Sequence, residues 1–173
     1  MIRWSVEAIV KSECYDKILI STDSDAIFDA VADLPVERHK RPAEHATVRA
    51  TALNAMLNLM ERYEKYDVFS YFLPTCPFVS PEDIRKGVDL LSDKIDSVLP
   101  VFDNLECGLT NSKFIKKYYK PSGAFYISWW DRLKENKNFF KGNTKGVIIP
   151  KERSVDINDE YDILQAEAIL NGA

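Results

Sequence analysis

The sequence predicts an α/β domain with a doubly wound, mostly parallel sheet and helices on both faces. Three observations predict this fold class. Strand-like and helical patterns alternate along the chain, as they do where helices cover a parallel sheet. A length of 173 residues is enough for a single domain with a core of its own. Short polar turns follow several predicted strands, which is where open α/β sheets bind ligands. We expect residues 1–173 to form one domain.

The first half of the chain alternates helical and strand-like patterns. Its predicted elements are, in order, a helix around 4–9, a strand at 17–20, a helix at 26–32 capped by Asp25, a strand at 36–38, a helix at 47–63 and a strand at 68–73. The helix at 47–63 has the clearest pattern, because Leu53, Met56, Leu57 and Met60 recur at spacings of three and four residues or adjoin one another. These side chains predict a face that packs on the sheet.

The second half continues the alternation. Ser80, Pro81 and Asp83 supply a cap residue, a proline at the first helical position and an acid in the first turn, so they predict the start of a helix. The remaining predicted elements are strands at 97–101, 124–128 and 146–149 and helices at 130–136 and 160–170.

Composition excludes several classes of protein. A formal net charge of −4 gives no basic surface for nucleic acid, and no continuous apolar segment predicts a membrane span. The three cysteines are odd in number and lack a Cys-x-x-Cys spacing, so neither a disulfide framework nor a zinc site is predicted. No secretory apolar region is present in the sequence, and we expect a cytoplasmic protein.

Asp156 and Asn158 are the polar residues that point most directly to a site. They alternate with Val155 and Ile157, so in an extended strand both polar side chains project from one face. Oxygen ligands there would suit Mg²⁺ beside the phosphates of a nucleotide. The alternative is a helix N-terminus, whose dipole favours acids and accounts for residues 159–162 without a metal. The helix N-terminus does not account for Asp156, which lies within the apolar segment, so we retain the metal interpretation for this residue.

Polar turns after other predicted strands supply further candidates. Ser21 and Asp23 can offer a hydroxyl and a carboxylate to a nucleotide, or can serve as helix caps. Arg41 can bind a base edge or a phosphate through paired hydrogen bonds, or can pair with Glu44 at the surface. Thr75 lies in a proline-flanked turn that either lets a ligand approach the backbone or simply ends a strand.

Other reactive or aromatic side chains have structural interpretations. Cys76 has no His near it in the sequence to activate it, so we predict a small buried residue. His39 and His45 are predicted to be surface groups, because a separation of six residues suits no metal site on a helix or strand. Phe139 and Phe140 predict either the wall of a pocket or core packing.

Six segments, in their order along the chain, resemble the cytidylyltransferase family. This family includes CMP-sialic acid synthetases (acylneuraminate cytidylyltransferases) and the enzymes for 3-deoxy-manno-octulosonate, pseudaminic acid and legionaminic acid. The segments are 17–23, 41–44, 74–77, 121–126, 139–140 and 154–158. They resemble the family's Ser-Thr-Asp turn, Arg-Pro-Ala-Glu element, Pro-Thr-Ser-Pro turn, Pro-Asn-Gly-Ala strand, paired phenylalanines and Ser-Ile-Asp-Ile-Asp element. The resemblance extends over residues 1–170.

The resemblance implies a Rossmann-like nucleotidyltransferase fold and a reaction in which CTP and an acidic 2-keto-3-deoxy sugar give a CMP-sugar and pyrophosphate. The anomeric hydroxyl attacks the α-phosphate, so positioning and charge neutralisation matter more than a covalent nucleophile. Mg²⁺ and a homodimer are also implied. The implied site residues are Arg41, Ala50 and Thr51, with Ser21 and Asp23, at the nucleotide; Thr75, Ser122, Tyr126, Phe139 and Phe140 at the sugar; and Asp156, which is also the catalytic residue, with Asn158 at the metal.

The sequence departs from the family pattern at its start and at several site positions. Family members begin with a strand and a Gly-, Lys- and Arg-rich loop that cradles the triphosphate, and this sequence opens with the helix that follows them. We therefore expect an N-terminally truncated domain. Asn158 replaces a second aspartate, Leu73 a glutamine and Ser122 an asparagine. We expect little or no activity. The alternatives are a noncatalytic relative that binds a nucleotide, a sugar or a partner, and an enzyme for another sugar acid or nucleotide.

Overall fold

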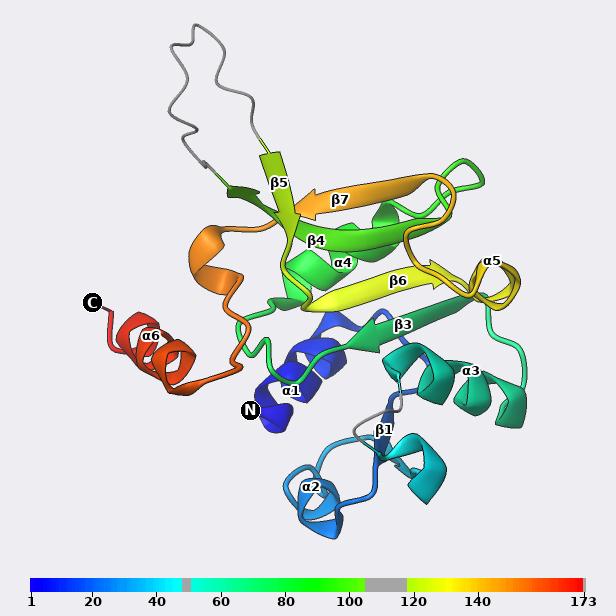
Figure 1. Ribbon diagram of the computed structural model, residues 1–173, viewed down its shortest axis with the longest axis horizontal. Helices are drawn as coiled ribbons and strands as arrows, with labels where there is room; N and C mark the ends of the chain where they lie inside the picture. The colour runs from blue at the N-terminus through cyan, green and yellow to red at the C-terminus, as the bar shows by residue number, and fades with distance from the viewer. Residues whose placement is uncertain (48–50, 105–117, 173) are drawn as a thin grey trace, which may run out of the picture.

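The computed structural model describes residues 1–47, 51–104 and 118–172 (Figure 1). The helices are α1 (Ile2–Ser12), α2 (Asp25–Asp29), α3 (Ala52–Arg62), α4 (Pro81–Asp89), α5 (Trp130–Asn136) and α6 (Glu160–Leu170), with 3-10 turns η1 (Ala43–His45) and η2 (Lys151–Arg153). The strands are β1 (Leu19–Thr22), β2 (Glu37–Lys40), β3 (Val68–Phe72), β4 (Ser97–Asn104), β5 (Tyr118–Pro121), β6 (Phe125–Trp129) and β7 (Thr144–Ile148). Among the described residues, no helix is both long and apolar enough to cross a membrane.

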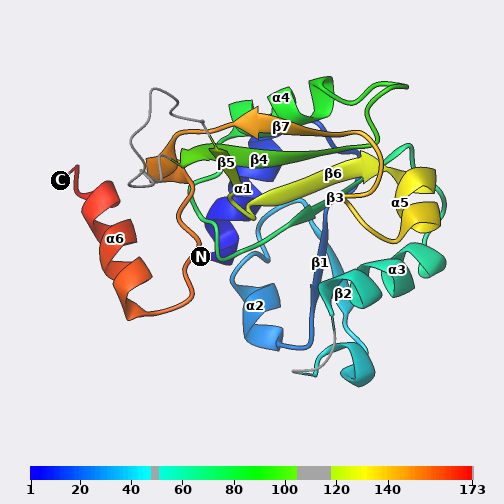
Figure 2. The ribbon, with the colours of Figure 1, turned by 45° about the horizontal axis from the view of Figure 1, so that its top comes forward.

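The strands form two separate sheets. The smaller sheet pairs β1 with β2 in parallel, and the larger has the order β3-β6-β4-β5 with β7 beside β4. Figure 2 shows the larger sheet with the smaller one beside β3. Pairings β3–β6, β4–β6 and β4–β5 are antiparallel, and only β4–β7 is parallel in the larger sheet as described.

The prediction of a mostly parallel sheet is therefore wrong for the described strands. The physical reason lies in the position of β5 and β6, which the sequence patterns did not reveal. Residues 122–124 link these two strands, and both run antiparallel to β4, with β5 beside residues 101–104 and β6 beside residues 97–98. Because β6 lies between β3 and β4 and is antiparallel to both, these two strands cannot pair directly with each other in parallel. Gly123 in this link has a φ of 84°, a conformation that glycine adopts without a steric penalty.

Helices cover both faces of the larger sheet, as predicted. Phe125 and Ile127 of β6 are fully buried in a cluster that includes side chains of α1 and α4. Tyr126 points to the opposite face and packs with the cluster built by α3 and α5. Helix α4 approaches the sheet closely at Gly87, where a Cβ atom would lie 2.7 Å from Ile127 Cδ1.

Local signals located most elements correctly, with three corrections. Strand β5 was not predicted, because its segment contains lysines and tyrosines that indicate a solvated face. The predicted strand through Asp156 is wrong: residues 154–158 form a loop, and Ile157 N of this loop donates to Thr75 O at 2.9 Å. Helix α2 begins after Ser24, so Asp25 lies in its first turn and is not its cap.

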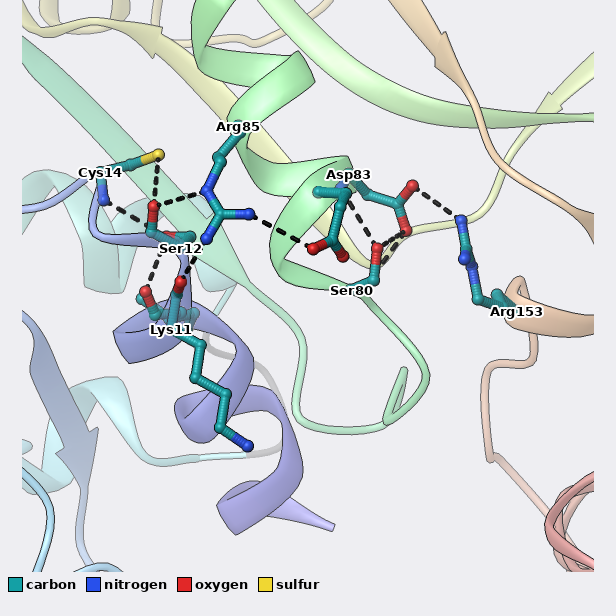
Figure 3. A network of polar contacts seen from close by, with 9 residues as sticks. Lys11, Ser12, Cys14, Ser80, Asp83, Arg85 and Arg153 are labelled. Carbon is teal, nitrogen blue, oxygen red and sulfur yellow. Dashed lines mark hydrogen bonds and ion pairs between the residues drawn. The ribbon is translucent and has the colours of Figure 1, made fainter.

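A buried carboxylate fastens the segment that leads to Asp156 (Figure 3). Asp83 is 1% exposed and accepts hydrogen bonds from Ser80 N and Oγ, completing a capping box at the start of α4. Arg153 of η2 donates from Nη2 to Asp83 Oδ1, at 2.8 Å. On the other side of α4, Arg85 donates to the carbonyl groups of Lys11 and Ser12 at the end of α1. The network thus joins α1, α4 and η2.

His39 is a buried residue, which corrects the prediction of a surface group. It is the one buried position of β2, with 9% exposure, and its ring packs edge-on against Tyr63, the residue after α3. Its Nδ1 lies 3.0 Å from Ser21 Oγ on β1. Burial, followed by the charges of Arg62 and Arg41, lowers the pKa of His39, while Glu37 raises it less. The neutral ring therefore ties β2 to β1.

Asp83→Ala is expected to lower the free energy of unfolding by about 2 to 3 kcal/mol, because it removes a helix cap and leaves the Arg153 guanidinium without its partner. Urea unfolding followed by circular dichroism measures this change. Asp89→Ala, at an exposed position of the same helix, should change the value by less than about 0.5 kcal/mol. Equal effects of the two substitutions would show that the network does not stabilise the fold.

His39→Asn is expected to weaken the pH dependence of stability on the acid side of neutrality. An unfolded histidine takes up a proton near pH ~6.5, whereas the folded His39 does so at lower pH, so unfolding is favoured as pH falls between these two pKa values. The wild-type free energy of unfolding should thus decrease from pH 7.5 to pH 5.5 more than that of the variant. Identical pH slopes in urea titrations would contradict the assignment.

Candidate functional site

A groove of about 900 Å³ lies between the two sheets. Its walls come from β1, β3 and helices α1 and α3, and its rim includes the loops that follow β1 and β2. Ser21, Asp23, Arg41 and Thr51, four of the five residues predicted at the nucleotide, line this groove. Ala50, the fifth, lies outside the described residues. The groove therefore gathers polar side chains from segments that are up to 30 residues apart in the sequence, from position 21 to position 51.

Arg41 is held at the edge of β1. Its Nη2 donates to the Ser21 carbonyl at 2.5 Å, and its Nε donates to Ser21 Oγ at 3.3 Å. Nη1 donates no hydrogen bond to any described residue, so part of the guanidinium is free for a ligand. Thr51 accepts from Asn54 N at 3.2 Å and caps α3. Ser21 thus positions Arg41, while Thr51 also has a structural role.

A second group of predicted residues meets beyond β3. The bond from Ile157 N to Thr75 O brings the loop that carries Asp156 against the turn after β3. The Cys76 thiol lies beside the Asp156 carboxylate, and burial, followed by this charge, raises the pKa of Cys76 to about 12. Cys76 is fully buried, so its thiol stays protonated at neutral pH and is no nucleophile.

Asp156 carries the one orphaned carboxylate oxygen of this group. Its Oδ1 is buried and has no hydrogen-bond partner among the described residues. Asn158 is exposed and donates from Nδ2 to the Asp156 carbonyl, at 3.1 Å, which leaves its amide oxygen available. Asp159 and Asp162 complete a capping box at the start of α6, so the helix-cap interpretation holds for them.

These residues fit a hard cation only in part. In the described part of the chain, no group of three or more His, Cys, Asp or Glu side chains could hold a metal ion. Asp156 and the Asn158 amide oxygen offer two oxygen ligands, and Mg²⁺ commonly takes others from substrate phosphates and water. The site therefore suits a metal that arrives with a nucleotide rather than one that is held by the protein alone.

Three of the five predicted sugar residues, Tyr126, Phe139 and Phe140, form an aromatic cluster. The Tyr126 ring centroid lies 5.3 Å from that of Phe139 and 5.9 Å from that of Phe140. Phe139 is buried in the core, whereas Phe140 is 58% exposed, so of the pair only Phe140 presents a ring to solvent. Ser122 is buried, and its hydroxyl accepts from Ala124 N at 3.3 Å within the turn before β6.

Tyr71 connects the two groups and was missed in the sequence. It lines the groove, and its ring stacks on that of Tyr126, with centroids 6.5 Å apart. Burial raises the pKa of Tyr71, and the nearby charge of Arg41 opposes this shift. Burial, then Cys76 and Asp156, raise the pKa of Tyr126. Arg41 thus lies close enough to Tyr71 to affect its pKa, Tyr71 stacks on Tyr126, and Asp156 lies close enough to Tyr126 to affect its pKa. The signal in the sequence that could have identified Tyr71 is a phenol side chain near the carboxyl end of the predicted strand at 68–73.

Comparison with known sequences gives consistent relatives. The family model described as cytidylyltransferase matches residues 1–122. The chain is 26% identical over 184 residues to an N-acylneuraminate cytidylyltransferase of Escherichia coli O18:K1:H7, with 94% of this chain and 44% of that protein covered. It is 26% identical over 203 residues to a CMP-N,N'-diacetyllegionaminic acid synthase of Legionella pneumophila, covering 98% of this chain and 84% of that protein. The chain thus spans less than half the length of the first of these relatives.

Solved structures agree on the fold. A 4-diphosphocytidyl-2C-methyl-D-erythritol synthase from Anaerococcus prevotii superposes with a TM-score of 0.76 at 12% identity, covering 98% of this chain and 88% of that one. A CMP:2-keto-3-deoxy-manno-octonic acid synthetase complexed with CTP gives 0.74 at 10% identity, with 99% and 87% covered. These likenesses show an α/β nucleotidyltransferase-like fold. Because the family model matches more than half of the sequence, the chain belongs to the cytidylyltransferase family.

Proposed function

We propose that this chain binds CTP and takes part in the transfer of CMP to an acidic 2-keto-3-deoxy sugar. The supporting observation is a row of neighbouring side chains, Arg41, Tyr71, Tyr126 and Asp156, that extends from the groove to the carboxylate with the unpaired oxygen. The printed names of two relatives, an N-acylneuraminate cytidylyltransferase and a CMP-N,N'-diacetyllegionaminic acid synthase, favour an acidic sugar as acceptor.

In the proposed reaction, the side chains of this row have separate roles. A sugar hydroxyl oxygen bonds to the α-phosphorus of CTP as the bond to the pyrophosphate oxygen breaks, and the hydroxyl proton leaves to solvent or a base. Arg41 would bind the nucleotide through charge-assisted hydrogen bonds, and Phe140 with Tyr126 would contact the sugar. Asp156 would hold Mg²⁺, which, when bound, neutralises phosphate charge.

A second candidate function is nucleotide binding without efficient turnover. Asn158 supports it, because a neutral amide attracts a divalent cation less strongly than a carboxylate does. Pyrophosphate release with CTP, Mg²⁺ and a panel of acidic 2-keto-3-deoxy sugars distinguishes the two candidates. Release at rates typical of enzymes, about 1 s⁻¹ or faster, supports catalysis. CTP binding without release supports the second candidate, and absence of both excludes the proposed function.

We also propose a homodimer in the cytoplasm. Helix α6 exposes Tyr161, Leu164 and Leu170, which are 81%, 61% and 55% accessible in the isolated chain. Exposed apolar side chains of this kind favour association with a further protein surface. Sedimentation velocity of the purified chain tests the dimer.

Arg41→Ala is expected to raise the dissociation constant of CTP about 10- to 100-fold, because charge-assisted hydrogen bonds contribute about 1.5 to 3 kcal/mol. Isothermal titration calorimetry measures the change. Arg38→Ala is the matched control, since Arg38 is exposed on β2, the strand that Arg41 follows, and its Nη2 lies 3.9 Å from Asp29 Oδ1. Equal affinities of both variants and the wild type would exclude Arg41 from the nucleotide site.

Asp156→Asn is expected to abolish any gain in CTP affinity that Mg²⁺ gives over EDTA, because the buried carboxylate is the charged metal ligand. Asn158→Asp should enlarge that gain by adding a second carboxylate. Calorimetric titrations in both buffers give the ratio of affinities for each variant. An Mg²⁺ effect that is unchanged in Asp156→Asn would remove Asp156 from the metal site.

A further inference from the structure

His39 and Arg41 both contact one serine of the neighbouring strand. Strands β1 and β2 pair in parallel, with Ser21 directly opposite His39 (Figure 2). Arg41 follows His39 by two residues, and Arg41 N donates to Thr22 O, so the pairing of the backbones continues as far as Arg41. Because side chains two residues apart in an extended segment project from the same face, His39 and Arg41 both approach Ser21. The register of the smaller sheet therefore brings these three side chains together.

The Ser21 hydroxyl is within hydrogen-bond distance of both side chains. His39 Nδ1 lies 3.0 Å from Ser21 Oγ, and Arg41 Nε donates to the same oxygen at 3.3 Å. A hydroxyl group has one proton to donate and two lone pairs that accept. Because a guanidinium group only donates, the hydroxyl proton of Ser21 can be used within this group only by His39.

The hydrogen bonds indicate which nitrogen of His39 carries the proton. With the proton on Nε2, Nδ1 accepts from the Ser21 hydroxyl, and one polar group, Nε2–H, has no partner among the described residues. With the proton on Nδ1, both Nε2 and the Ser21 hydroxyl proton have no partner in the described part of the chain. Because each unpaired buried polar group costs free energy, the proton on Nε2 is the more stable arrangement.

The surroundings of His39 favour a neutral ring, which preserves the accepting lone pair of Nδ1. Burial, followed by the charges of Arg62 and Arg41, lowers the pKa of His39, and Glu37 opposes this shift. Tyr63 packs edge-on against the ring, and its hydroxyl donates to Glu37 Oε1 at 3.1 Å. A protonated ring would carry an N–H at both nitrogens and could no longer accept from a hydroxyl.

We propose that His39 is a positioning residue for Arg41 and acts by accepting a hydrogen bond from the Ser21 hydroxyl. With the O–H held by Nδ1, the lone pairs of Ser21 Oγ are available to Arg41 Nε, while the Ser21 carbonyl accepts from Nη2. Nη1 keeps its donors for a ligand. His39 is not among the described residues that line the groove, so it reaches the site only through Ser21. The inference rests on the proposed function in that Arg41 binds the nucleotide.

NMR of the wild-type chain without a nucleotide tests the hydrogen bond itself. Long-range ¹H–¹⁵N correlation spectra at neutral pH should show the His39 proton on Nε2, with Nδ1 as the acceptor. A proton on Nδ1 overturns the proposal. This measurement needs no variant, so it holds even where a substitution at His39 prevents folding.

Exchange of the Arg41 Nε–H with solvent tests whether the hydrogen bond positions Arg41. In His39→Phe the exchange should become at least about threefold faster, because the ring remains but no longer accepts from Ser21. His39→Asn is the matched variant and should restore the wild-type rate, since its amide oxygen can accept in place of Nδ1. Equal rates in all three proteins, or equal acceleration in both variants, would show that His39 has only a structural role.

Calorimetric titration with CTP separates this inference from the proposed function. His39→Phe is expected to weaken CTP binding about 3- to 10-fold, whereas His39→Asn should bind as the wild type does. In an Arg41→Ala background, His39→Phe should cause no further loss, because its effect passes through Arg41. Equal losses in both backgrounds overturn the positioning role. If the wild type binds no CTP, the proposed function fails, while the exchange of the Arg41 Nε–H still decides whether His39 positions this side chain.

Discussion

The hydrogen bond from Ile157 N to Thr75 O is the contact on which the candidate site depends. Residues 154–158 form no strand, so no ladder fixes Asp156. Among the described residues, this backbone bond is the one that joins the loop to the turn containing Cys76. Two anchors support it along the chain. Arg153 is held by the buried Asp83 upstream, and the capping box of α6 fixes the chain downstream. These contacts hold the backbone around a carboxylate oxygen that is buried without a hydrogen-bond partner among the described residues.

The two halves of the site come from different sheets and have different electrostatic properties. On the smaller sheet, Ser21 holds the Arg41 guanidinium at the groove, and the neutral His39 beside Ser21 adds no charge of its own. Beyond β3, the protonated Cys76 adds no charge, so Asp156 supplies the negative potential. Tyr71 stands between these opposite charges and stacks on Tyr126. A ligand with an anionic portion and a planar ring would meet complementary groups in both halves.

Local signals in the sequence were sufficient for the helices but not for the sheet. The helices at 130–136 and 160–170 have the predicted bounds, because capping and periodicity are encoded within each segment. Strand direction is not encoded within a segment, because it depends on which strands become neighbours. Strand β5 also lacks the apolar pattern that would predict a strand. Asp156 was placed in a strand by alternation alone. His39 and Tyr71 acquire their roles from contacts with Ser21 and Tyr126, which are 18 and 55 residues away in the sequence and cannot be read from spacing.

The division into two sheets has a consequence for cooperativity. Val6, Ile20, Phe28 and Val31 form a small core of their own around β1, separate from the two larger clusters. Among the described strands, no backbone ladder joins β3 to this unit, so local opening there has a lower free energy than global unfolding. The β1–β2 unit can therefore melt as a separate foldon while the larger sheet remains intact.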